Sequence, residues 1–102
     1  MAPATVVTGA GPNWIAIDPS GRYAYVANMN GTTVSQYTVG TDGRLTAMGT
    51  SAVASGAEPS SVAVDPTGRY AYVSNWGGST VSQFTIGTGG SLTIMATPGV
   101  TA

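Results

Sequence analysis

The chain has 102 residues, a formal net charge of −1 and only seven charged side chains, and it contains neither histidine nor cysteine. These absences exclude disulfides, the usual zinc sites and nucleophiles activated by histidine, so we expect no metal and no cofactor. Three cations are too few to neutralise phosphates, and no apolar run reaches the roughly 20 residues that span a bilayer. Nucleic-acid and membrane partners are therefore not expected.

The composition favours a folded, β-rich chain. Low net charge together with many valine, isoleucine, tyrosine and tryptophan side chains is the opposite of a disordered composition. Residues 1–8 lack the basic region and the long apolar stretch of a signal peptide. We therefore expect a soluble chain with no signal peptide in this sequence, while its compartment stays open.

A repeat with a period of 47 residues organises the sequence. Residues 12–55 align with residues 59–102, and 25 of the 44 paired positions are identical. Periods of about 40–50 residues with strand signals are typical of propeller arrays. We therefore divide the chain into an N-terminal outer-strand or linker segment (1–11), a first blade (12–55), a linker (56–58) and a second blade (59–102).

Each repeat predicts four short strands that alternate with turns. In chain order, the expected strands span residues 14–18, 22–28, 33–39 and 45–50, and then 61–65, 69–75, 80–86 and 92–97. Small or apolar residues occupy both faces of these strands. That pattern suits sheets that are covered on both sides, as propeller blades are.

The first turn of each repeat has the sequence Asp-Pro-Ser/Thr-Gly-Arg, in which aspartate caps, proline presets φ and glycine accepts a left-handed backbone. We assign structural roles in these turns to Asp18, Gly21, Arg22, Asp65, Gly68 and Arg69. The alternative is that Asp18 and Asp65 form a carboxylate pair for acid–base chemistry. No arrangement of residues stands out as catalytic, so we assign none.

The segments Tyr25-Val-Ala-Asn28 and Tyr72-Val-Ser-Asn75 follow these turns and resemble the YVTN-type repeat, which also occurs in lactonase-like (6-phosphogluconolactonase-like) β-propellers. The tails Gly-Arg-Leu-Thr and Gly-Ser-Leu-Thr are similar to the outer strand of that family. The resemblance covers essentially the whole chain and implies four-stranded antiparallel blades and a hydrolytic ancestry. Family members typically carry seven blades, whereas this sequence contains two.

Two blades leave two broad apolar faces without cover, and exposed faces of that size mark interaction surfaces. Because the two faces of a blade differ, the expected contact is head-to-tail and closes into a ring. Three chains would give six blades and four chains eight. A seven-bladed wedge of about 51° lies closer to the about 45° of eight blades than to the about 60° of six, which favours a homotetramer over a homotrimer.

The loops before the first strand and between the second and third strands open on one face of a propeller. At these loops and the strand ends beside them lie the candidate ligand-binding residues Asn13, Trp14, Asn28, Met29, Glu58, Asn75 and Trp76. Aromatic faces beside amides suit a sugar or another small neutral ligand. Loop packing and turn chemistry, or a solvated charge for Glu58, are the structural alternatives.

These observations predict an all-β, two-bladed module that assembles with itself and serves as a structural or binding scaffold rather than as an enzyme. A lactonase-like hydrolase is the first alternative, because the resemblance implies it. A lectin-like ring that binds carbohydrate is the second, because of the tryptophans and amides at the loops.

Overall fold

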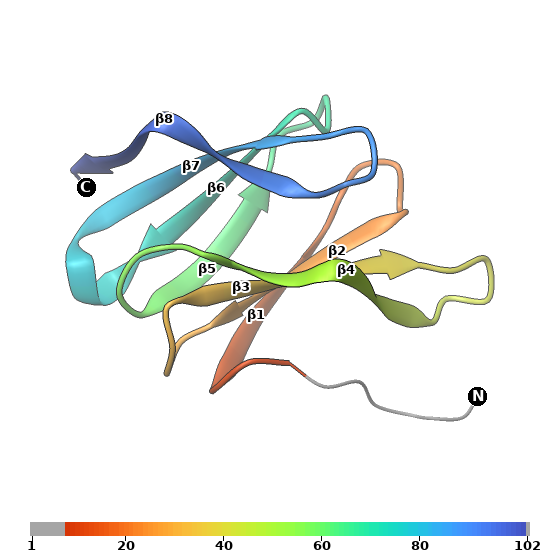
Figure 1. Ribbon diagram of the computed structural model, residues 1–102, viewed down its shortest axis with the longest axis horizontal. Coiled ribbons are helices and arrows are strands. Elements are labelled where there is room, and N and C mark those ends of the chain that lie inside the picture. The colour runs from red at the N-terminus through yellow and green to blue at the C-terminus, as the bar shows by residue number, and fades with distance from the viewer. Residues whose placement is uncertain (1–7, 102) are drawn as a thin grey trace.

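The computed structural model describes the backbone of residues 8–101, and the side chains of residues 8–50 and 52–95. Within this range, eight strands form two four-stranded antiparallel sheets, each in sequence order (Figure 1). Blade 1 consists of β1 (Pro12–Ile17), β2 (Tyr23–Asn28), β3 (Thr33–Val39) and β4 (Leu45–Ala54). Blade 2 consists of β5 (Pro59–Val64), β6 (Tyr70–Asn75), β7 (Thr80–Ile86) and β8 (Leu92–Thr101). The expected pair of four-stranded antiparallel sheets is thereby confirmed.

The outer strands are longer than the sequence indicates. Strands β4 and β8 each contain ten residues and continue past the ends expected at residues 50 and 97. In each blade a register shift between the third and fourth strands, at Ser35/Tyr37 and Ser82/Phe84, lets pairing resume beyond the irregularity. Of the N-terminal segment expected at 1–11, residues 1–7 lie outside the described residues.

Each sheet has a front face and a back face, because side chains alternate along a strand. We call front the face that carries the two tyrosines of the second strand, Tyr23 and Tyr25 in blade 1 and Tyr70 and Tyr72 in blade 2. The back face carries the alanine and valine between and after these tyrosines. The front of blade 1 packs on the back of blade 2, with β5 lying against β1 and β2.

The core lies between the two sheets. Blade 1 contributes front-face side chains and blade 2 contributes back-face side chains to one buried cluster, which consists of Tyr25, Ala27, Val34, Val62, Ala71, Val73, Phe84 and Leu92. A smaller cluster of Ala24, Val26 and Tyr37 lies on the back of blade 1, with Val39 and Leu45 packed against it. Equivalent positions of the two repeats therefore have different surroundings: Ala71, Val73 and Phe84 pack between the sheets, whereas their counterparts lie on the back of blade 1.

Hydrogen bonds fix the register between the blades. The buried hydroxyl of Tyr25 donates to the carbonyl of Gly90, and Oε1 of Gln36 accepts a 2.6 Å bond from the amide of Leu92. Gln36 also donates through Nε2 to the carbonyl of Thr50 at 2.7 Å. Burial, followed by the charge of Asp18 and by Tyr23, raises the pKa of Tyr25, which keeps its hydroxyl a neutral donor.

Helical structure is minimal. The described residues contain one 3-10 turn, η1 (Trp76–Gly78), between β6 and β7. Across residues 8–101 no helix combines the length and the apolar character needed to cross a bilayer.

The two-sheet core predicts the effect of removing one of its aromatic side chains. Phe84 is fully buried, so Phe84→Ala is expected to lower the free energy of unfolding by about 3–5 kcal/mol. The neighbouring Thr85 is exposed, and Thr85→Ala is expected to cost less than about 1 kcal/mol. Urea unfolding followed by circular dichroism measures both. Equal losses in the two variants would contradict the assigned faces of β7.

Candidate functional site

Four of the seven predicted ligand residues line two hollows, one on each blade, whereas Asn28, Met29 and Glu58 line neither of these two. The blade 1 pocket has a volume of about 380 Å³ and is lined by Thr8, Pro12, Asn13, Trp14, Ile15, Val26, Tyr37 and Leu45. The blade 2 pocket has a volume of about 400 Å³ and is lined by Ser60, Ser74, Asn75, Trp76, Ser79 and Thr80. The two tryptophans, which the sequence placed on one face, thus line different pockets.

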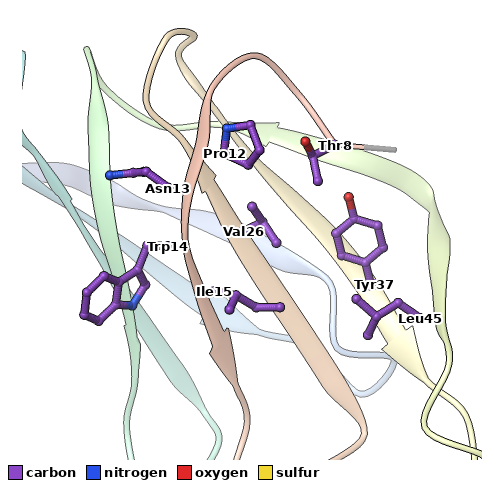
Figure 2. Close-up of a pocket in the computed structure, with 8 residues that line it drawn as sticks. All are labelled: Thr8, Pro12, Asn13, Trp14, Ile15, Val26, Tyr37 and Leu45. Atoms are coloured by element: carbon purple, nitrogen blue, oxygen red, sulfur yellow. The ribbon is translucent and has the colours of Figure 1, made fainter. Parts of the chain in front are cut away.

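The blade 1 pocket is mostly apolar and lies over the back face. Figure 2 shows Ile15, Val26 and Leu45 on one side of β1, and Asn13 and Trp14 on the other. The indole of Trp14 donates a 3.2 Å hydrogen bond to the carbonyl of Val62 in blade 2. Asn13 likewise donates to Ser60 at 3.3 Å. Both of these side chains therefore link the two blades.

Asn28 and Asn75 are buried and act within their own blades. Oδ1 of Asn28 accepts from the amide of Gly9 at 3.2 Å, and Oδ1 of Asn75 accepts from Gly56 at 3.0 Å. Each Nδ2 donates to a threonine and a serine hydroxyl of the following strand. This bonding pattern, the same in both repeats, favours turn chemistry over ligand binding for the asparagine pair.

Met29 and Glu58 lie at equivalent corners of the two blades. The amide of Met29 donates to the carbonyl of Gly11 at 2.9 Å, and the amide of Trp76 donates to the carbonyl of Glu58 at 2.9 Å. Glu58 has a φ of 52°, a left-handed conformation that is uncommon for a residue with a side chain. Trp76 is 70% exposed, so it is available at the surface.

The aspartates of the first turns are held by their own loops. Oδ1 of Asp18 accepts from the amides of Arg22 and Tyr23, both at 3.0 Å, and the Ser20 hydroxyl donates to the same carboxylate. Asp65 has the same partners one repeat later. The glycines that close these turns, Gly21 and Gly68, have φ values of 75° and 73°. Arg22 and Arg69 thus meet the aspartates through backbone amides.

These donors set the ionisation of both aspartates. Burial alone would raise the pKa of Asp18, but the Ser20 hydroxyl and the amides of Tyr23, Arg22 and Ser20 together hold it below its usual value. The Thr67 hydroxyl is the largest influence on Asp65 and, with three backbone amides, lowers its pKa as well. Both groups are therefore stabilised as anions within turns.

The remaining charges do not gather into a reaction centre. Among the described residues, no three acids lie close enough to hold a metal ion, and the ion pair present is the exposed contact between Arg44 and Asp42 at 3.3 Å. Asp18 and Asp65 serve separate turns. The hydroxyl groups of the blade 2 pocket were not among the predicted site residues, although Ser60 and Ser74 differ from their repeat counterparts Asn13 and Ala27.

The sequence matches the family described as "Lactonase, 7-bladed beta-propeller" over residues 1–97. No protein of curated function matches the sequence.

Solved structures give further similarities. A putative 6-phosphogluconolactonase from Bacteroides fragilis aligns with a TM-score of 0.83 and 25% identity over 97% of this chain and 28% of its own. A protein of unknown function from Desulfotomaculum acetoxidans aligns with a TM-score of 0.74 and 27% identity over 82% of this chain and 26% of its own. The periplasmic gluconolactonase of Pseudomonas aeruginosa, at 22% identity and a TM-score of 0.79, shares the fold over 98% of this chain and 28% of its own. The chain thus spans about a quarter of these proteins.

The turn geometry predicts a pH dependence. Because the pKa of Asp18 is lower in the folded chain, its carboxylate stabilises the fold above the unfolded pKa of about 3.9, and this stabilisation is lost as the pH falls toward the folded value. The free energy of unfolding, measured with urea between about pH 6 and pH 2, is expected to fall. Asp18→Asn should flatten that fall, and Thr41→Asn, at an exposed and uncharged position, should not. An unchanged slope in Asp18→Asn would contradict the assigned hydrogen bonds.

Proposed function

Because the chain belongs to the seven-bladed lactonase propeller family, we propose that it is an assembly module that completes a propeller with further copies of itself. The ring that results serves as a structural and binding scaffold. The observation that carries the proposal is the pairing of faces: one front and one back are joined within the chain, and one front and one back remain uncovered by the other blade.

Exposure at equivalent positions supports this proposal. Tyr25 is 0% exposed at the junction between the blades, whereas its repeat counterpart Tyr72 is 37% exposed. On the opposite faces, Val62 is 3% exposed, whereas its counterpart Ile15 is 52% exposed. Large apolar side chains at such exposures mark an interaction surface when they share one face. Tyr72 on the free front and Ile15 on the free back are thus equivalent, in the repeat, to side chains that are buried where the two blades meet.

The repeat also predicts the contacts of the junction between copies. Within the chain, the hydroxyls of Tyr23 and Tyr25 donate to carbonyls of the β7–β8 turn, and Gln36 accepts from the first amide of β8. We expect the equivalent bonds between two copies. The hydroxyls of Tyr70 and Tyr72 in one copy would donate to the carbonyls of Thr41 and Gly43 in the next, and Gln83 would accept from the amide of Leu45.

The contact is head-to-tail, since a front meets a back, and such contacts form either closed rings or open filaments. Blades of a propeller are wedge-shaped, which favours closure. With two blades per chain, closed rings contain an even number of blades. The family's seven-bladed wedge of about 51° favours a homotetramer of eight blades, at about 45° each, over a homotrimer.

Two capping variants test the proposal. Tyr72→Glu places a charge on the free front and Ile15→Glu places one on the free back, both at exposed positions. Each variant alone is expected to sediment as a single chain, because every junction needs both faces. Mixed together, they should form a 1:1 dimer through the one intact front and the one intact back. Thr32→Glu, at an exposed β2–β3 corner, is the control and should assemble as the unmodified chain does.

Sedimentation velocity distinguishes these species. Retention of the unmodified mass by either capping variant would overturn the proposed faces. A mixture that stays monomeric would overturn the head-to-tail contact.

A second candidate function, lactone hydrolysis, is favoured by the family and by the description of the B. fragilis structure as a putative 6-phosphogluconolactonase. Asp18 is bound into a turn, whereas Glu58 is exposed at a corner beside Trp76. If the chain hydrolyses gluconolactone, Glu58→Gln is expected to abolish the activity and Asp18→Asn to reduce it only through stability. A titration assay of acid release measures both. Hydrolysis that persists when Glu58→Gln and Asp18→Asn are combined in one chain would show that neither acid takes part in the reaction.

A further inference from the structure

Six of the differences between the two repeats lie at one corner of blade 2. This corner joins the start of β5, the end of β6 and η1. In blade 2 it carries Glu58, Ser60, Ser61, Ser74, Trp76 and Gly77. At the same positions blade 1 carries Gly11, Asn13, Trp14, Ala27, Met29 and Asn30. At these positions blade 2 therefore has three hydroxyls and one carboxylate that blade 1 lacks. The indole also changes place, from Trp14, which is 52% exposed, to Trp76, which is 70% exposed.

Two of these differences compensate each other. In blade 1 the side chain of Asn30 packs against Gly11, so closely that a Cβ on the glycine would clash with it. In blade 2 the roles are reversed, because Glu58 packs against Gly77 and a Cβ there would clash with the Glu58 carboxylate. The corner thus keeps one large side chain, but in blade 2 that side chain is an acid. Glu58 adopts a left-handed backbone conformation with φ of 52°.

The blade 2 pocket combines an aromatic surface with hydroxyl groups. Trp76 is 70% exposed and lines the pocket beside the side chains of Ser60, Ser74, Ser79 and Thr80. The hydroxyl of Ser60 lies 3.1 Å from that of Ser74, and the buried amide of Asn75 donates to the Thr80 hydroxyl at 3.3 Å. The Ser60 hydroxyl also donates to the Ser74 carbonyl at 3.2 Å, and the Ser61 hydroxyl lies 2.6 Å from that of Ser74. A hydroxyl oxygen has two lone pairs, so these groups can still accept from a ligand, and the Ser79 hydroxyl can donate as well as accept.

Charge narrows the class of ligand. Arg22, Arg44 and Arg69 all lie at turns between the first and second or the third and fourth strands. In these antiparallel sheets such turns are at the opposite end of the strands from the β6–β7 corner that holds Trp76. The charged side chain at this corner is the carboxylate of Glu58, which packs against Gly77. An anionic ligand would meet repulsion there and no cation from these three arginines.

We propose that the blade 2 pocket binds a neutral saccharide, with the apolar face of a sugar ring on the Trp76 indole and the sugar hydroxyls on the serine and threonine rim. The volume of about 400 Å³ lies within the range of roughly 300–1,000 Å³ of small-molecule sites. All the lining residues belong to blade 2, so the site is formed by one chain. Ser60 and Ser74 lie on the front of this blade, which the proposed ring would cover, so the titrations below use the Ile15→Glu chain as the parent, in which this front stays free.

The test follows the two indole N–H resonances of the chain by NMR during titration with glucose, maltose, cellobiose and lactose. Trp14→Phe and Trp76→Phe assign the two resonances. A saturable shift of the Trp76 resonance is expected with at least one of these sugars. Trp76→Ala should weaken that binding by about tenfold or more while the fold, checked by circular dichroism, is retained. Trp14→Phe is the matched control and should retain the affinity.

Glucose 6-phosphate tests the predicted class, because it differs from glucose by an anionic group. It is expected to bind more weakly than the neutral sugars, and Glu58→Gln should reduce that difference while leaving neutral binding within about twofold. The proposal is overturned if no neutral sugar saturates the Trp76 shift below about 10 mM, if Trp76→Ala binds as the parent chain does, or if glucose 6-phosphate is preferred.

Discussion

The packing of one blade's front on the next blade's back is the interaction on which the rest of the structure depends. Tyr25 shows it most clearly, because its ring is fully buried between the sheets and its hydroxyl satisfies the Gly90 carbonyl of the other blade. An unpaired buried carbonyl costs about 1–3 kcal/mol, so the hydroxyl fixes the register as well as the contact. The internal repeat offers the same interaction again at Tyr72 and Gly43, and this symmetry is the basis of the proposed assembly.

Local patterns were enough to predict much of the fold. The Asp-Pro-Ser/Thr-Gly turns have one dominant geometry, and the structure gives Gly21 the left-handed φ of 75° that this sequence requires. The alternation in Tyr70–Asn75 likewise specifies a strand with two distinct faces. The lengths of β4 and β8 could not be predicted, because a register shift lets each continue on its neighbour beyond the residues with high strand preference.

The candidate site was less accessible from sequence, because its contacts are not periodic. Trp14 lies within β1 and Trp76 begins the turn after β6, at positions that are not equivalent in the repeat. Trp14 is 52% exposed and bonds Val62 across the blade junction, whereas Trp76 is 70% exposed beside a serine and threonine rim. The bond from Trp14 to Val62 joins residues 48 apart in the chain, so the sequence near Trp14 does not predict it. The exchange of Gly11 and Asn30 for Glu58 and Gly77 was visible in the alignment of the repeats, but its meaning depends on the two positions being in contact.

In the proposed assembly, copies of the chain cover its two free end faces. Native mass spectrometry of the unmodified chain at micromolar concentration tests this most directly, because each added chain raises the mass of the assembly by 10.1 kDa. A dominant species of four chains, or of three with six blades, is the predicted spectrum. A single population at the subunit mass, compact and melting cooperatively, would show that both faces tolerate water and would contradict the account.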